Sequence, residues 1–113
     1  MTNYLERSEL LAQIPPIFIG FFERYNEWLT DTHGDSINWH PTLNFCRVVR
    51  NAAAHGSINF RNPRAPAVTW RGLNFGPADN GRQIIGGDLR VGDVVGLKFE
   101  ANDELNRIGA PIL

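Results

Sequence analysis

Three side chains that could act together on a phosphate lie within the short stretch from Arg50 to His55. His55 can exchange a proton near neutral pH, because histidine titrates in that range. Arg50 stays charged and could neutralise a phosphate oxygen as negative charge develops on it. Asn51, four residues before His55, stands one helical turn away and could orient the imidazole. These residue types suit metal-independent cleavage of RNA, in which a 2′-hydroxyl attacks the neighbouring phosphate.

The stretch ends a segment whose composition predicts a helix from Pro41 to about Ala54, closed by Gly56 in the left-handed conformation. Wound at about 100° per residue, this helix has an apolar face and a cationic polar face. The apolar face holds Phe45, Cys46, Val48, Val49, Ala52 and Ala53, and the polar face holds Asn44, Arg47, Arg50, Asn51 and His55.

The same winding separates Arg50 and His55 by about 140°, so one undistorted helix does not aim both side chains at one atom. Two copies of the helix paired across a two-fold axis could line one composite groove with both sets of residues. The hypothesis of catalysis therefore requires a homodimer.

Basic residues are concentrated in the middle of the chain. Residues 40–87 contain six arginines against Asp79 alone, whereas both flanking segments are acidic. Anionic ligands should therefore meet the middle segment, and the planar fork of arginine matches a phosphate in two-point contact. We expect Arg47, Arg61 and Arg64 to contact nucleic acid.

The string Arg50-Asn51-Ala52-Ala53-Ala54-His55 resembles the signature of the HEPN superfamily, an arginine and a polar residue followed after a short interval by histidine on a late helix. The resemblance implies a dimeric helical domain, often a metal-independent endoribonuclease in toxin-antitoxin, antiphage or RNA-processing systems. It implies that Arg50 and His55 are catalytic and that Asn51 assists. An RNA substrate and a protein partner such as an antitoxin would follow from the same resemblance.

Other uses of these residues stay open. Arg50 could form an ion pair with an acidic residue of the first helical region, Asn51 could bond to backbone, and His55 could only end its helix. A HEPN-like module could instead bind a nucleic acid, a nucleotide or a protein without catalysis. A third reading is an interaction protein that uses the aromatic residues of the first helices, with Phe21 as the residue to test.

No metal or cofactor is expected. Cys46 is the only cysteine, and the three histidines lack paired ligand spacing. The lone cysteine also favours a reducing compartment, and no stretch approaches the roughly 18 apolar residues of a membrane span. We therefore expect a cytoplasmic protein without a membrane segment.

The chain of 113 residues suits a single domain of the α+β class. We expect N-terminal antiparallel helices, HEPN-like, followed by a small antiparallel sheet or hairpin, with a helical part over 1–56 and a β-rich part over 57–113. Asn3 and Glu6 predict a first helix over about 3–13, interrupted by Pro15 and Pro16. A second helix then carries an aromatic stripe that suits a core, and a polar loop spans 31–40. Strands are expected within 67–75, at 84–85 and over 94–99.

Overall fold

The computed structural model describes the backbone from Arg7 onward and the side chains from Ala12 onward. Within this part, the main elements are helices α1 (Arg7–His33), α2 (Pro41–His55) and α3 (Val91–Arg107) and the strands β1 (Val68–Trp70) and β2 (Leu73–Phe75). The predicted α+β class, with helices preceding a small antiparallel sheet, is confirmed. The proposed helix start at Asn3 and Glu6 lies outside the described residues.

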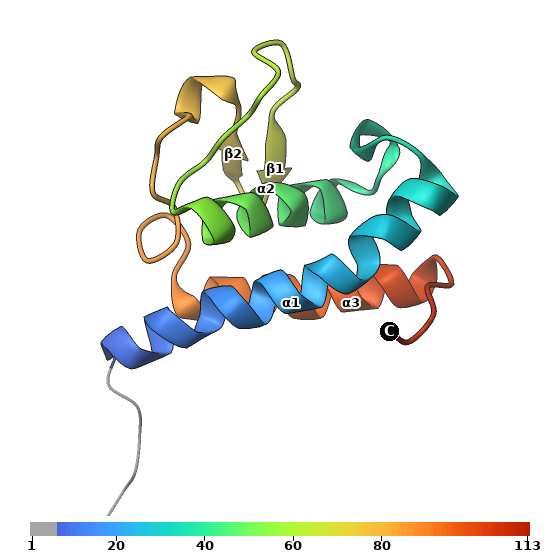
Figure 1. Cartoon of the computed structure of the whole chain (residues 1–113), viewed down its shortest axis with the longest axis horizontal. Coiled ribbons are helices and arrows are strands. Elements are labelled where there is room, and N and C mark those ends of the chain that lie inside the picture. Colours follow the sequence, from blue (N-terminus) through green and yellow to red (C-terminus); the bar gives the residue numbers. More distant parts are fainter. Residues whose placement is uncertain (1–6) are drawn as a thin grey trace, which may run out of the picture.

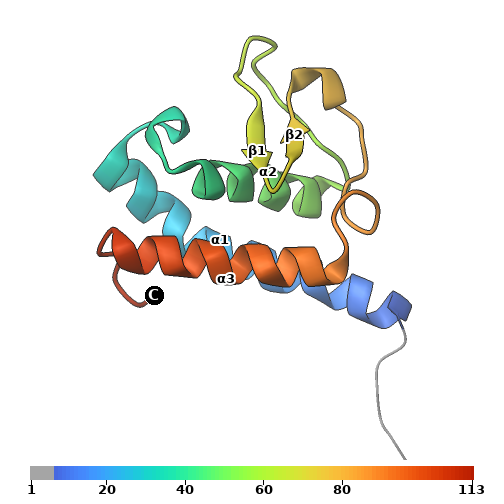
Figure 2. The ribbon, with the colours of Figure 1, turned by 180° about the vertical axis from the view of Figure 1, so that it is seen from behind.

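The elements form three layers with α2 in the middle. Helices α1 and α3 lie side by side below α2, and the hairpin stands on the opposite side of α2, as Figure 1 and the reverse view in Figure 2 show. Phe45 of α2 stacks on Phe75 of β2 with 5.7 Å between ring centroids, and Trp70 of β1 lies at 5.6 Å. Helix α2 is therefore buried on its apolar face while its polar face stays accessible.

The prediction that Pro15 and Pro16 separate two helices is wrong, because α1 runs through both prolines. A proline inside a helix removes one backbone hydrogen bond and adds a clash, yet tertiary packing can outweigh this cost. Ile14, directly before the prolines, packs against the core, and Phe18, two residues after Pro16, is buried. Burial on both sides of the prolines holds the segment in one helix.

The aromatic stripe of α1 belongs to the core, as expected. Phe18, Phe21, Tyr25 and Leu29 are buried, whereas Ile17 is exposed. The ring of Phe21 packs against those of Phe18 and Tyr25. Because Phe21 is 5% exposed, its side chain is not accessible to a protein partner in this fold.

The prediction of a strand over residues 94–99 is wrong, because these residues lie within α3. The buried side chains Val94, Leu97, Ala101 and Leu105 follow helical spacing and pack into the core. The Asp93 carboxylate accepts a hydrogen bond from the Arg90 backbone N–H at 2.9 Å, which satisfies a donor at the start of the helix. The part of the chain expected to be β-rich therefore ends in a helix.

The segment expected to hold a strand within 67–75 forms a tight hairpin. Arg71 and Gly72 connect β1 to β2 with φ angles of 48° and 80°, the combination that a two-residue turn between twisted strands requires. The predicted strand at 84–85 is reduced to an isolated bridge between Ile85 and Leu89. Buried Ile84 anchors this loop in the core.

A polar cluster joins the hairpin turn to α3. The Glu100 carboxylate forms an ion pair with Arg71 at 2.8 Å and accepts a hydrogen bond from the Trp70 indole N–H. The Arg71 guanidinium also lies 4.6 Å from the centre of the Trp70 ring. These contacts lower the pKa of Glu100, chiefly through the hydrogen bond from Arg71.

No described helix combines the length and apolar character that crossing a membrane requires.

Candidate active site

Helix α2 places the predicted site residues because both of its ends are defined. Pro41 is its first residue, and the His40 imidazole caps this end by accepting a hydrogen bond from the Thr42 N–H at 3.2 Å. Gly56 ends the helix with a φ of 84°, and its N–H donates to the Ala52 carbonyl at 2.7 Å. The predictions for Pro41 and Gly56 are confirmed.

The segment of residues 57–67, here called the roof, passes over the polar face of α2 and has no regular secondary structure. Ile58 is paired with the 76–82 turn through two backbone hydrogen bonds, one donated to the Arg82 carbonyl at 3.0 Å and one accepted from the Gly81 N–H at 2.9 Å. The Asn80 side chain bonds to both backbone groups of Phe60, at 2.6 and 3.0 Å. The roof is therefore fixed by a turn about twenty residues further along the chain.

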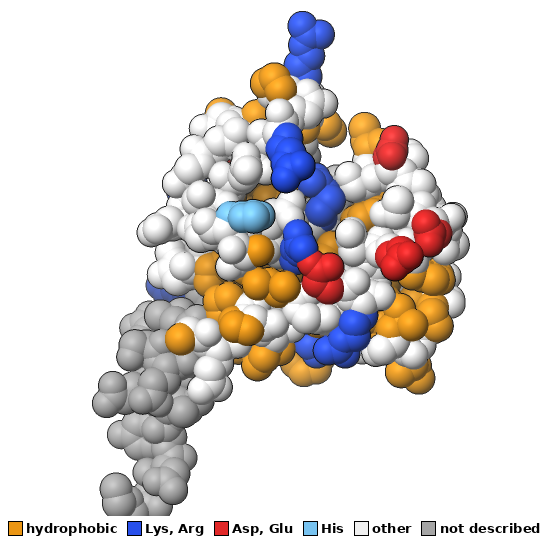
Figure 3. Space-filling view, viewed as in Figure 1, with side chains coloured by type: hydrophobic (Ala, Val, Ile, Leu, Met, Phe, Trp, Pro, Cys, Tyr) orange, Lys and Arg blue, Asp and Glu red, His pale blue; other side chains and the backbone are white. Residues whose placement is uncertain are grey.

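A groove of about 540 Å³ lies between α2 and the roof. Figure 3 shows a histidine and several basic side chains gathered in this hollow, with an acidic side chain against them. Of the six predicted site residues, five line it: Arg47, Arg50, Asn51 and His55 from α2, and Arg61 from the roof. The structure thus brings the expected catalytic residues and two of the three expected nucleic-acid-binding residues to one cavity.

Arg50 is held in place by two neighbours. It forms an ion pair with Glu23 of α1, and it donates a hydrogen bond to the Asn51 side-chain oxygen at 2.8 Å. The Arg50 side chain keeps 30% of its surface exposed, so a ligand in the groove can reach it. The alternative in which Arg50 pairs with an acidic residue of the first helical region is confirmed as a contact, and it leaves Arg50 accessible.

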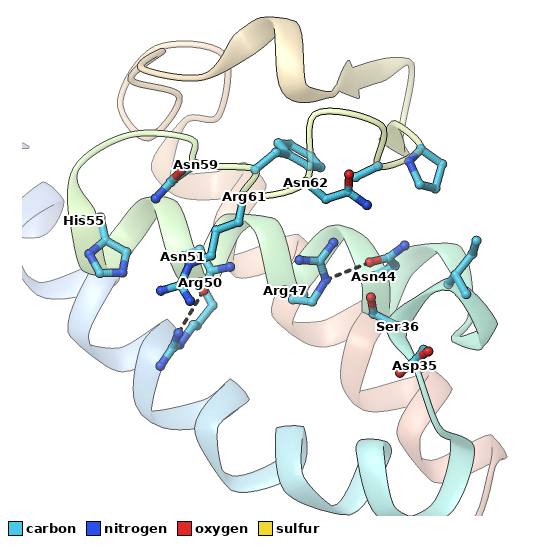
Figure 4. Close-up of a pocket in the computed structure, with 14 residues that line it drawn as sticks. Asp35, Ser36, Asn44, Arg47, Arg50, Asn51, His55, Asn59, Arg61 and Asn62 are labelled. Carbon is cyan, nitrogen blue, oxygen red and sulfur yellow. Dashed lines mark hydrogen bonds between the residues drawn. The ribbon is translucent and has the colours of Figure 1, made fainter.

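His55 occupies the last position of α2, where it is exposed and lines the groove. Figure 4 shows it at one end of the cavity, with Arg50 and Asn51 further along the helix. The angular separation of Arg50 and His55 on the helix does not prevent both from lining the same groove. Their accessibility satisfies the first requirement of the catalytic hypothesis.

Arg47 is half-buried in the groove wall, one turn before Arg50. Its Nε–H donates to the Asn44 side-chain oxygen at 3.0 Å, and burial lowers the pKa of its guanidinium. Among the described residues it forms no ion pair with any carboxylate. The charge of Arg47 is therefore partly removed from water and is balanced by no described carboxylate. A cation in this state favours the binding of an anion.

The two arginines of the roof differ in position. Arg61 reaches into the groove opposite α2 (Figure 4), whereas exposed Arg64 does not line it. The prediction that Arg64 contacts nucleic acid together with the other residues gains no support from this arrangement.

Sequence reasoning missed the asparagines that complete the lining, which are Asn59 and Asn62 of the roof, and it assigned no role to Asn44 of α2. It interpreted Asn80 only as part of a turn. The frequency of asparagine near the basic residues was the one available signal, but no local pattern shows which amides meet in space.

Within residues 12–113, no three side chains of His, Cys, Asp or Glu are grouped so as to hold a metal ion. Comparison of the chain with protein-family models, with curated protein sequences and with solved structures finds no match. Functional inference therefore depends on the geometry of the groove and on the resemblance of the motif within it.

Proposed function

We propose that this protein is a HEPN-like, metal-independent endoribonuclease that acts as a homodimer in the cytoplasm. The observation that carries the proposal is that Arg50, Asn51 and His55 line one accessible groove, together with Arg47 and Arg61. An arginine and a histidine beside a phosphodiester supply charge stabilisation and proton transfer, the two functions that this cleavage needs.

In the proposed reaction the 2′-hydroxyl of RNA attacks the adjacent phosphorus while His55 accepts its proton. The bond between phosphorus and the 5′-oxygen breaks, and that oxygen leaves with a proton donated by a second acid. The products are a 2′,3′-cyclic phosphate and a free 5′-hydroxyl. Arg50 neutralises the non-bridging oxygens as they gain charge, and Asn51 positions Arg50 through their hydrogen bond.

The second acid is the reason for proposing a dimer. Each chain contributes one histidine to its groove, whereas the reaction takes up one proton and delivers another. Exposed His55 at the very end of α2 could meet its equivalent from a second copy across a two-fold axis. A protein inhibitor of the antitoxin type would then be expected to cover the same groove.

Cleavage of a labelled RNA in excess chelator tests the proposal. Wild-type protein should cleave it, and Arg50→Ala and His55→Ala should each lose at least about a hundredfold in rate. Arg90→Ala and His33→Ala are matched controls, because both residues are exposed and lie outside the groove. Absence of cleavage by folded wild-type protein, or equal losses in the controls, would refute the nuclease proposal.

Mixing wild-type protein with the His55→Ala variant tests the dimer. The proposed site needs His55 from both chains, so a mixed dimer has no complete site. After random exchange of subunits at equal amounts, about one quarter of the activity of an all-wild-type sample of the same total concentration should remain. If about one half remains although differently tagged subunits show that mixed dimers have formed, each site is built within one chain. A monomer in solution would refute the dimer itself.

A second candidate is a non-catalytic module that binds nucleic acid, a nucleotide or a protein through the same groove. The ion pair between Arg50 and Glu23 favours it, because Glu23 neutralises the charge that catalysis would use. RNA binding without cleavage would support this candidate against the nuclease.

A further inference from the structure

Three asparagine side chains of the groove each accept a hydrogen bond from the protein through their oxygen atoms. The amide oxygens of Asn44 and Asn51 accept hydrogen bonds from arginine side chains of the same helix, at 3.0 and 2.8 Å. The amide oxygen of Asn62 accepts from the Arg64 backbone N–H at 3.0 Å. Arginine and backbone N–H groups can only donate, so the contacting atom of each amide must be its oxygen. The NH₂ group of each side chain is thus left to donate to a ligand.

The arginines that line the groove reinforce this polarity, because a guanidinium has five N–H donors and no acceptor. Between Asn44 and Asn51, donors therefore predominate among the side chains on the polar face of α2. The acceptor-bearing residues Ser36 and Asp35 lie beside Asn44, at the opposite end of the groove from His55 (Figure 4). A ligand that meets this stretch of α2 must supply acceptors.

Phosphate oxygens only accept hydrogen bonds, whereas the edges of nucleobases present both donors and acceptors. A surface on which donors predominate therefore matches the phosphates of a nucleic acid and offers little to the amino groups of bases. The volume of about 540 Å³ suits a piece of single strand rather than a duplex. Arg47 and Arg50, three residues apart on one helix face, form two neighbouring donor pairs with Asn44 and Asn51.

We infer that the groove binds the sugar-phosphate backbone of single-stranded RNA at two consecutive phosphates and does not read the bases. One phosphate lies against Arg50 and the Asn51 amide, and the next lies against Arg47 and the Asn44 amide. The inference rests on the proposed function for the identity of the polymer as RNA. It does not depend on cleavage, because binding by these donors precedes any proton transfer.

The test uses the full chain carrying His55→Ala and a labelled 2′-O-methyl RNA, which lacks the attacking hydroxyl, with affinity measured by fluorescence anisotropy. Asn44→Asp is the informative change. An aspartate still accepts from Arg47, but its second oxygen replaces the outward NH₂ group and repels a phosphate. Affinity should fall at least about tenfold. Asn102→Asp adds the same charge at an exposed position of α3 outside the groove and should change affinity less than about twofold.

Arg47→Ala should weaken binding and lower the slope of log affinity against log salt by about 0.7, the value for loss of one phosphate contact on a single strand. Arg47→Lys should recover most of the salt slope. Oligomers of uridine, adenosine and cytidine should bind within about threefold of one another, and methylphosphonate linkages should abolish binding.

Several results would overturn the inference: equal binding by the Asn44→Asp and Asn102→Asp variants, a preference of more than about tenfold among bases, tighter binding of a duplex, or no RNA binding by folded protein. Thermal unfolding checks that each variant folds, and Asn51→Asp provides the same comparison at the neighbouring pair if Asn44→Asp does not fold. Binding of the 2′-O-methyl RNA with no cleavage of ordinary RNA would refute the nuclease and leave the inference standing.

Discussion

Glu23 should weaken RNA binding, because it competes with a bound phosphate for Arg50. The two side chains form an ion pair, and their exposed fractions are 45% for Glu23 and 30% for Arg50. Replacing Glu23 by glutamine removes the charge and keeps the shape of the side chain. We expect Glu23→Gln to bind single-stranded RNA more tightly and to be slightly less stable.

The exposure of the pair sets the size of both effects. Ion pairs exposed to this degree contribute about 0.2–1 kcal/mol. The upper end applies here because the hydrogen bond to Asn51 already restricts Arg50. If RNA binding no longer has to break an ion pair worth about 1 kcal/mol, affinity should rise about fivefold. The same loss in the free protein should lower the melting temperature by about 4 °C or less.

Anisotropy with 2′-O-methyl RNA and thermal unfolding measure the two effects on the same preparation. Glu27→Gln is the matched control, because Glu27 is exposed one turn away on α1 and forms no ion pair with a described residue. In an Arg50→Ala background the gain from Glu23→Gln should vanish. Equal gains from both glutamine variants, or a gain that survives without Arg50, would show that only net charge matters and would refute the competition.

Three further predictions concern stability and reactivity. The pKa of Glu100 is lowered by Arg71, so its contribution is present above the ordinary glutamate pKa and lost as pH falls through the lowered value. Glu100→Gln should therefore cost up to about 1 kcal/mol in urea unfolding at pH 7, and this difference should shrink in acid. Burial, with a smaller effect from Glu100, raises the pKa of the Cys46 thiol. A thiol reagent should therefore modify Cys46 only at the rate of unfolding. Gly56→Ala should cost about 1–2 kcal/mol in urea unfolding, because its φ of 84° is unfavourable for alanine. The added methyl group would meet no other atom, so the backbone conformation alone causes this cost. Unchanged unfolding of Glu100→Gln at pH 7 would contradict the first expectation. Labelling of Cys46 faster than unfolding would contradict the second, and unchanged stability of Gly56→Ala would contradict the third.

The parts of the fold that the sequence predicts correctly are those with local signals. Pro41 and Gly56 mark the ends of α2 because the conformations of proline and glycine restrict where a helix starts and stops. The strand expected over 94–99 was wrong because Val94 and Val95 favour a strand locally. Burial of side chains at helical spacing in α3 outweighs that preference, and this burial depends on contacts with α1 and α2.

The site divides in the same way. Spacing on one helix was enough to place Arg47, Arg50 and His55 along a common surface. The sequence does not reveal that Glu23 is the partner of Arg50, because the two residues meet only after α1 packs on α2. The position of the roof could not be predicted from the sequence either, because it depends on a hydrogen bond between Phe60 and Asn80.

The way in which the roof is held has consequences for how the protein can evolve. One side chain, Asn80, takes the place of a neighbouring strand by bonding to both backbone groups of Phe60. Substitutions in the distant 76–82 turn can therefore widen or narrow the groove while every residue that contacts RNA stays the same. Relatives with the same motif could therefore differ in which RNA strands their grooves bind.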